Sequence, residues 1–162
     1  MSDLNHYVSI YKEQVAKGDI QKAYTGIVKY VTRLGTNLSN KLSERYSFGG
    51  LLQGYMDYTY VYYTNDYLKQ RKLKMGLVLN HTEMRFEVWL LGQTAPVQQK
   101  YWHYFKDTKW NEGRMEMPKY SILETVIVAY PDFNDLDGLS EEIEARLLEV
   151  SGKIIEDIKK TD

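Results

Sequence analysis

The spacing of apolar residues changes from a helical period to a strand period at about Gln53, and this change decides the fold class. Before it, the junction Lys17–Gly18–Asp19 separates two segments, because glycine ends a helix and an aspartate can cap the next one. Asp3 is placed to cap the first segment. The apolar stripes of the two segments are Leu4, Tyr7, Val8, Tyr11 and Val15, and then Ile20, Ala23, Tyr24, Ile27, Val31, Leu34 and Leu38. A junction this short predicts an antiparallel helical hairpin at the start of the chain.

Beyond Gln53, β-branched and aromatic residues alternate with a period of two, as is typical of strands. The expected segments are strands at 54–63, 74–79, 84–91 and 122–130, a helix that starts at Thr94 and Pro96, a loop at 107–120 and a last helix from Leu136. The order is α-α-β-β-β-α-β-α, which lacks the alternating βα units of a doubly wound sheet. We expect a single α+β domain over residues 1–162, with a helical hairpin and a four-stranded, mostly antiparallel sheet. One helix lies between the last two strands, and another ends the chain.

Composition restricts the partners of this chain. With 21 basic and 22 acidic residues, it lacks the overall positive charge of a nucleic-acid-binding or membrane-surface protein. The absence of cysteine excludes disulfides, cysteine nucleophiles and thiolate metal sites. Apolar runs are too short for a membrane helix, and the first residues lack the pattern of a secretory signal, so a cytoplasmic location is expected. Residues 121–162 hold four basic and eleven acidic groups, which predicts packing against a basic surface, within the fold or across a homodimer.

Strand alternation predicts which side chains share a face of the sheet. The apolar positions Met75, Leu77, Leu79, Met84, Phe86, Val88 and Leu90 are assigned to the core. In the first strand, we expect Thr59 and Val61 to lie on the polar face of the sheet, opposite the core. On this basis the candidate ligand-binding residues are Tyr55, Asp57, Arg85, Glu87 and Trp89, with Lys74 beside them. Carboxylates near a guanidinium and aromatic rings suit a small polar ligand. The alternatives are a solvated face with ordinary cross-strand ion pairs and a pair of catalytic carboxylates.

Other motifs give no cofactor or metal site. Residues 132–144 resemble a calcium-binding loop, but Phe133 stands where the first acidic ligand belongs. His6, His81 and His103 are scattered and form no zinc motif. We therefore expect neither a cofactor nor a metal ion.

Four segments carry a resemblance to a known family. They are Lys22–Ile27, Gly54–Tyr60, Arg85–Leu90 and Ile127–Phe133. With these segments the chain resembles a family of small uncharacterised bacterial proteins, known as a domain of unknown function. The resemblance implies a bacterial cytoplasmic protein, and it brings no activity, ligand or catalytic residue.

The leading hypothesis is a noncatalytic binding or interaction module with a Tyr- and Trp-rich, carboxylate-bearing sheet face. Its partner would be a small polar ligand or another protein. The alternative is a small hydrolase or transferase that uses Asp57 and Glu87 around a divalent cation. A third hypothesis is a homodimer formed through the last helix, where Leu148 and Ile155 flank the apolar stripe.

Overall fold

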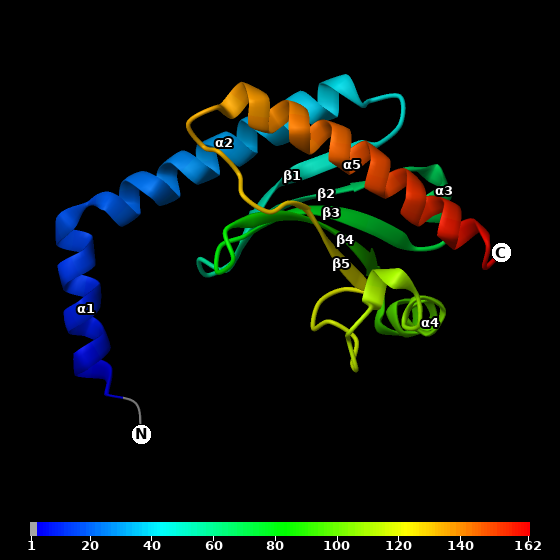
Figure 1. Cartoon of the computed structure of the whole chain (residues 1–162), viewed down its shortest axis with the longest axis horizontal. Helices are drawn as coiled ribbons and strands as arrows, with labels where there is room; N and C mark the ends of the chain where they lie inside the picture. The colour runs from blue at the N-terminus through cyan, green and yellow to red at the C-terminus, as the bar shows by residue number, and fades with distance from the viewer. Residues whose placement is uncertain (1–2) are drawn as a thin grey trace.

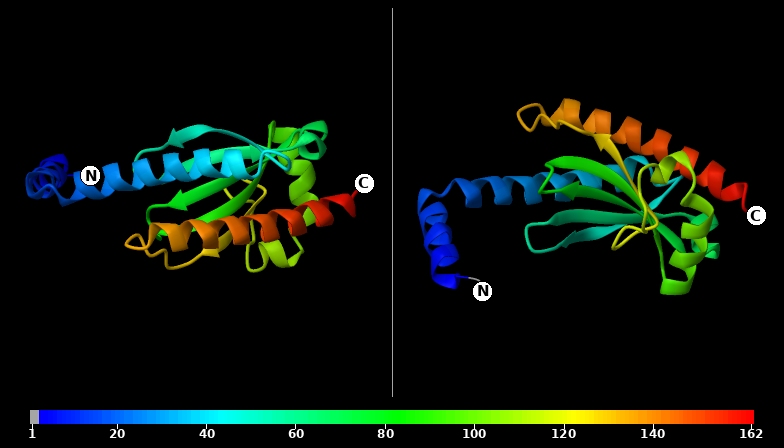
Figure 2. Two further views of the ribbon diagram at one scale, coloured as in Figure 1. Left: turned by 90° about the horizontal axis from the view of Figure 1, so that it is seen from above. Right: turned by 60° about the horizontal axis from the view of Figure 1, so that its bottom comes forward.

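The computed structural model describes residues 3–162 as a five-stranded antiparallel sheet covered on one face by two long helices (Figure 1). The strands lie in the order β1-β2-β3-β4-β5, so each strand pairs with its neighbour in sequence. Helices α2 and α5 lie side by side across the sheet (Figure 2). We call the sheet face turned away from them the open face. The elements are α1 Leu4–Lys17, α2 Asp19–Lys41, β1 Ser47–Gln53, β2 Tyr58–Thr64, α3 Asp66–Gln70, β3 Leu73–Asn80, β4 Arg85–Gly92, α4 Ala95–Phe105, the 3-10 helix η1 Lys109–Asn111, β5 Leu123–Val128 and α5 Leu136–Lys159.

The α+β class, the β3–β4 hairpin and the helix between the last two strands are confirmed, but the expected number of strands is wrong. Strand β1 precedes the segment that was expected to be the first strand, and it brings the sheet in the described residues to five strands. Its sequence hides it, because Gly49 and Gly50 interrupt the alternation where the pairing with β2 shifts register. The following residues 54–57 form the turn into β2 and are not part of the strand.

The expected phase of the first long strand is also wrong. Thr59, Val61 and Tyr63 of β2 are buried on the core side, whereas Tyr58, Tyr60 and Tyr62 lie on the open face. The polar groups of the inner set are satisfied locally. The Thr59 hydroxyl is hydrogen-bonded to His81 Nε2 at 2.7 Å, and the Tyr63 hydroxyl to Ser151 Oγ of α5 at 2.7 Å. These hydrogen bonds compensate the free-energy cost of removing a hydroxyl from water, so this strand carries polar atoms on both faces.

The core lies between the sheet and the two covering helices. The residues expected on the core face of the hairpin are buried there except Met84, which lies in the turn before β4 with a positive φ of 49° and is 37% exposed. The helices contribute Val31, Leu34 and Leu38 of α2 and Ile143, Leu147, Ile154 and Ile158 of α5. Leu148 and Ile155 pack against the same core and are partly buried. They therefore do not form the second, free apolar strip on which the dimer through the last helix was based. None of the described helices is long and apolar enough to cross a membrane.

The first two helices do not form the expected hairpin. The Asp3 cap is confirmed, since its carboxylate accepts a hydrogen bond from the His6 backbone N–H at 3.1 Å. At Gly18 the backbone takes a positive φ of 81°, and α1 turns away from α2 and extends beyond the body of the protein (Figures 1 and 2). None of the fourteen described residues of α1 is buried. The apolar stripe of α2 is buried against the core only from Tyr30 to Leu38, and its first part, next to α1, is exposed or partly exposed as well.

Candidate ligand pocket on the open face

Aromatic side chains from two strands and one loop surround a cavity on the open face. We call this cavity, of about 360 Å³, the aromatic pocket. Strand pairing explains it, because Tyr60 of β2 lies opposite Val78 of β3, while Tyr62 and Trp89 lie on either side of Gly76. The pocket is lined by Gly54, Asp57, Tyr58, Tyr60, Tyr62, Val78, Trp89, Leu91 and Tyr120.

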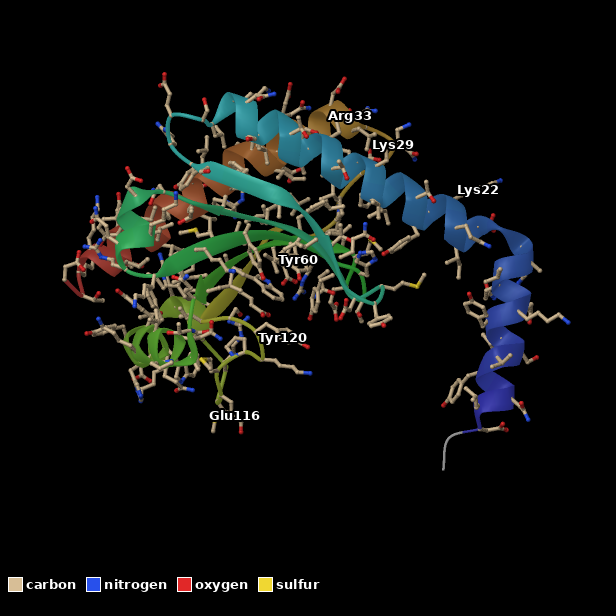
Figure 3. All side chains as sticks on the ribbon, turned by 180° about the vertical axis from the view of Figure 1, so that it is seen from behind. Lys22, Lys29, Arg33, Tyr60, Glu116 and Tyr120 are labelled. Carbon is tan, nitrogen blue, oxygen red and sulfur yellow. The ribbon has the colours of Figure 1, made fainter. Side chains whose placement is uncertain are left out.

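Tyr120 comes from the segment between η1 and β5, which folds back beside the open face. Figure 3 shows Tyr60 and Tyr120 on the side of the sheet opposite α2, while Glu116 of the same segment points away from the body. The Tyr120 ring meets the Tyr58 ring edge to face at a centroid distance of 6.5 Å. Tyr58 in turn stands edge to face against Trp89 at 5.1 Å. Edge-to-face contacts of this kind are a favoured arrangement of aromatic pairs, and they link Tyr120, Tyr58 and Trp89 in one cluster.

A buried carboxylate fixes the indole of Trp89. Glu87 is only 2% exposed, and its Oε1 accepts a hydrogen bond from Trp89 Nε1 at 2.8 Å. Its Oε2 accepts one from Arg85 Nε at 2.7 Å and another from Asn80 Nδ2 at 3.1 Å. A buried charge is tolerated when it is paired and hydrogen-bonded in this way. Glu87 therefore anchors one wall of the aromatic pocket from behind.

Carboxylates give the pocket a negative electrostatic environment. Burial raises the pKa of Glu124, although its carboxylate accepts a hydrogen bond from Ser121 Oγ at 2.8 Å, and the nearby charge of Glu87 raises that pKa further. The pKa of Tyr58 is raised first by burial, and then by the charges of Glu124, Glu87 and Asp57. A phenol whose deprotonation is opposed by three carboxylates lies in a field that favours cations.

Two aromatic rings of the lining already contact cations, and the ammonium of Lys119 lies 5.1 Å from the centroid of the Tyr120 ring. The ammonium of Lys74 lies 3.7 Å from the centroid of the Tyr62 ring. Burial lowers the pKa of Lys74.

The residues expected to bind a ligand fall into three groups. Asp57 and Trp89 line the aromatic pocket. Glu87 lies behind Trp89 and is paired with Arg85, whose side chain is about one-third exposed at the start of β4. Tyr55 is fully exposed in the turn at 54–57 and is not part of the lining.

Sequence reasoning missed four tyrosines of the pocket: Tyr58, Tyr60, Tyr62 and Tyr120. The first three form one alternating set in the strand, and they would have been found if Thr59 and Val61 had been assigned to the core. Tyr120 carries no periodic signal, because it lies in an irregular segment.

Within residues 3–162, no three histidine, aspartate or glutamate side chains are grouped so that they could hold a metal ion. Asp57 also accepts a hydrogen bond from the Tyr58 backbone N–H at 2.7 Å.

A comparison with protein families places almost the whole chain in one group. A family model described as a domain of unknown function, DUF7000, matches residues 4–158. No curated protein and no solved structure matches the chain.

Proposed function

The chain belongs to the DUF7000 family, a domain of unknown function, and we propose that it is a noncatalytic binding module whose aromatic pocket holds a small organic cation. One observation carries this proposal. Five aromatic rings surround a single cavity beside carboxylates, on the face of the sheet that no long helix covers.

Aromatic rings recognise cations through the negative potential of their faces. An ammonium group within about 6 Å of a ring centroid is attracted, most strongly when the site excludes water. Several rings around one cavity form an aromatic cage, which suits a methylated or alkylated ammonium because its carbon atoms also gain apolar contact. The contact of Lys74 with Tyr62 supports this reading, because an ammonium already lies over one ring of the lining.

The charges near the pocket support a cation over an anion. Asp57 lies in its lining, and Glu124 lies opposite Trp89 in the neighbouring strand. Of the nearby cations, Arg85 is engaged by Glu87, and Lys74 and Lys119 lie over rings of the lining. The fields of the two remaining carboxylates favour a positive ligand, and both would be strengthened by the low polarity of the surrounding rings.

The volume sets the size of the ligand. A cavity of about 360 Å³ is near the lower end of small-molecule sites. It is large enough for one ammonium group with several carbon atoms. A reaction based on Asp57 and Glu87 has less support, because three donors already engage the two oxygens of Glu87.

The test compares a cation with its neutral isostere. Choline and 3,3-dimethylbutan-1-ol have nearly the same shape and differ in the charge of the central atom. We expect choline at millimolar concentration to raise the melting temperature and to change tryptophan fluorescence, and the alcohol to do neither. A ligand at a hundredfold excess over its Kd stabilises the native state by about 2.7 kcal/mol.

A matched pair of variants locates the site. Tyr60→Leu removes a ring from the pocket and should abolish the choline effect, whereas Tyr130→Leu removes a tyrosine that is 94% exposed and lies outside the lining. Equal responses to choline and to the alcohol would show that charge plays no part. The absence of any response to choline, tetramethylammonium and aliphatic diamines would overturn the proposal.

A further inference from the structure

Helix α1 has an exposed apolar stripe and no partner among the described residues. Leu4, Tyr7, Val8, Tyr11 and Val15 are 37% to 69% exposed, although all five point to one side of the helix. At 100° per residue they fall within an arc of about 100°, which is the width of a stripe that normally faces a core. A helix of fourteen residues is marginally stable in water without tertiary contacts. The stripe therefore requires a covering surface.

The spacing within the stripe is that of a helix pair. Leu4, Val8, Tyr11 and Val15 follow one another at intervals of four, three and four residues, which is the alternation of a coiled-coil seam over about two heptads. The seam ends where the helix ends, at Gly18. A helix that packs against a sheet needs only a broad stripe, so this regular alternation favours another helix with the same spacing.

The stripe provides enough area for a reversible dimer. If the five side chains were fully covered, about 600 Å² would leave water in each copy. Two copies would then bury about 1,200 Å², which lies at the lower limit of specific interfaces. Because α1 extends beyond the body of the protein, the stripe of one copy is accessible to the stripe of another (Figure 1).

We infer that α1 is a dimerisation arm that pairs with α1 of a second copy of this chain. The pair is antiparallel and two-fold symmetric, so that Leu4 lies opposite Val15 of the other copy and Val8 opposite Tyr11. An antiparallel arrangement sets the two helix dipoles in opposition and places the two protein bodies at opposite ends of the pair. A parallel pair would crowd both bodies at the same end, since each is joined to its arm at Gly18.

Sedimentation velocity tests the inference with the full-length protein, at concentrations from about 1 to 100 µM, the range of a micromolar Kd. The wild type should shift from monomer to dimer, and Val8→Glu should raise the Kd at least tenfold. Ile10→Glu is the matched control, because Ile10 is exposed on the same helix but lies outside the seam. It should leave the Kd unchanged. The choline response of all three proteins should be equal, because α1 does not contribute to the aromatic pocket.

A second measurement tests the register and does not depend on a disruptive charge. The natural chain lacks cysteine, so a single introduced thiol reports one position. Mixing Val8→Cys with Tyr11→Cys under mild oxidation should produce a disulfide-linked heterodimer, and mixing Ile10→Cys with Tyr11→Cys should not. A wild type that stays monomeric at about 100 µM would overturn the inference. So would a Val8→Glu dimer as tight as the wild type, or the absence of the seam cross-link.

Discussion

Replacing Glu87 with glutamine should destabilise the protein far more than its small change in volume suggests. The carboxylate supplies two acceptor oxygens, which receive donors from Trp89, Arg85 and Asn80. Glutamine has a single acceptor oxygen, and its amide group is a donor. Whichever way the amide is oriented, at least one of these donors meets another donor.

The size of the loss in stability follows from how deeply the two main donors, Trp89 and Arg85, are buried. If the indole of Trp89, which is 5% exposed, loses its acceptor, the orphaned N–H costs about 1–3 kcal/mol. Losing the charge-assisted bond to Arg85 costs about 1 kcal/mol, because the side chain of Arg85 is partly exposed and water replaces part of the interaction. The expected total is about 2–4 kcal/mol, which at about 2 kcal/mol per molar urea lowers the unfolding midpoint by about 1–2 M.

Urea unfolding followed by far-ultraviolet circular dichroism measures this loss without depending on the altered tryptophan. Glu116→Gln is the control, because Glu116 points into solvent from an exposed loop (Figure 3), and a substitution of this kind changes stability by about 0.5 kcal/mol or less. In a Trp89→Phe background the cost of Glu87→Gln should fall by about 1–3 kcal/mol, since the indole donor is gone. A Glu87→Gln midpoint equal to that of the control would refute the role assigned to this network.

Three further predictions concern other parts of the fold. Gly92→Ala should lower the free energy of unfolding by about 2 kcal/mol in a thermal melt, because its Cβ would lie 2.6 Å from the backbone nitrogen of Gln98. Tyr63→Phe should cost about 1–3 kcal/mol in urea unfolding, because the buried Ser151 hydroxyl loses its partner. The pKa of Glu124 is raised above its ordinary 4.5, so the folded state binds a proton at this carboxylate more tightly than the unfolded state does. The folded state therefore loses stability as the pH rises from about 4.5 through the pKa of Glu124 in the folded state. Glu124→Gln should therefore raise the urea midpoint at about pH 7 relative to the wild type and should have little effect at about pH 4. If Glu124→Gln shifted the urea midpoint by the same amount at both pH values, the raised pKa of Glu124 would be contradicted.

Long periodic segments were predictable from the sequence, and short or irregular ones were not. The stripes of α2 and α5 run over several turns, so each helix is specified by many residues at once. Strand β1 has seven residues, two of which are glycines, and its pairing with β2 shifts register. Edge strands bury little, so their pattern carries little information.

The pocket was harder to predict because tyrosine suits both faces of a sheet. Its ring is apolar and its hydroxyl is polar, so Tyr63 is buried with Ser151 as its partner while Tyr60 is partly exposed on the open face. The phase of β2 depends on His81, which satisfies the buried Thr59 hydroxyl from another segment. Contacts of this type depend on tertiary structure, and no local pattern of residues reveals them.

The order of the strands has a consequence for how the chain folds during its synthesis on the ribosome. Strands β1 to β4 each pair with the one made just before them across short connections, so these hairpins can close as the chain emerges, whereas β5 joins β4 only after α4 and η1 have been made. The apolar layer of α5 is the exception, because its seven buried residues come after all five strands. Until that helix has been synthesised, the part of the core that α5 covers is open to water and to other nascent chains. The interval before α5 emerges is therefore the period when a chaperone would protect this chain most.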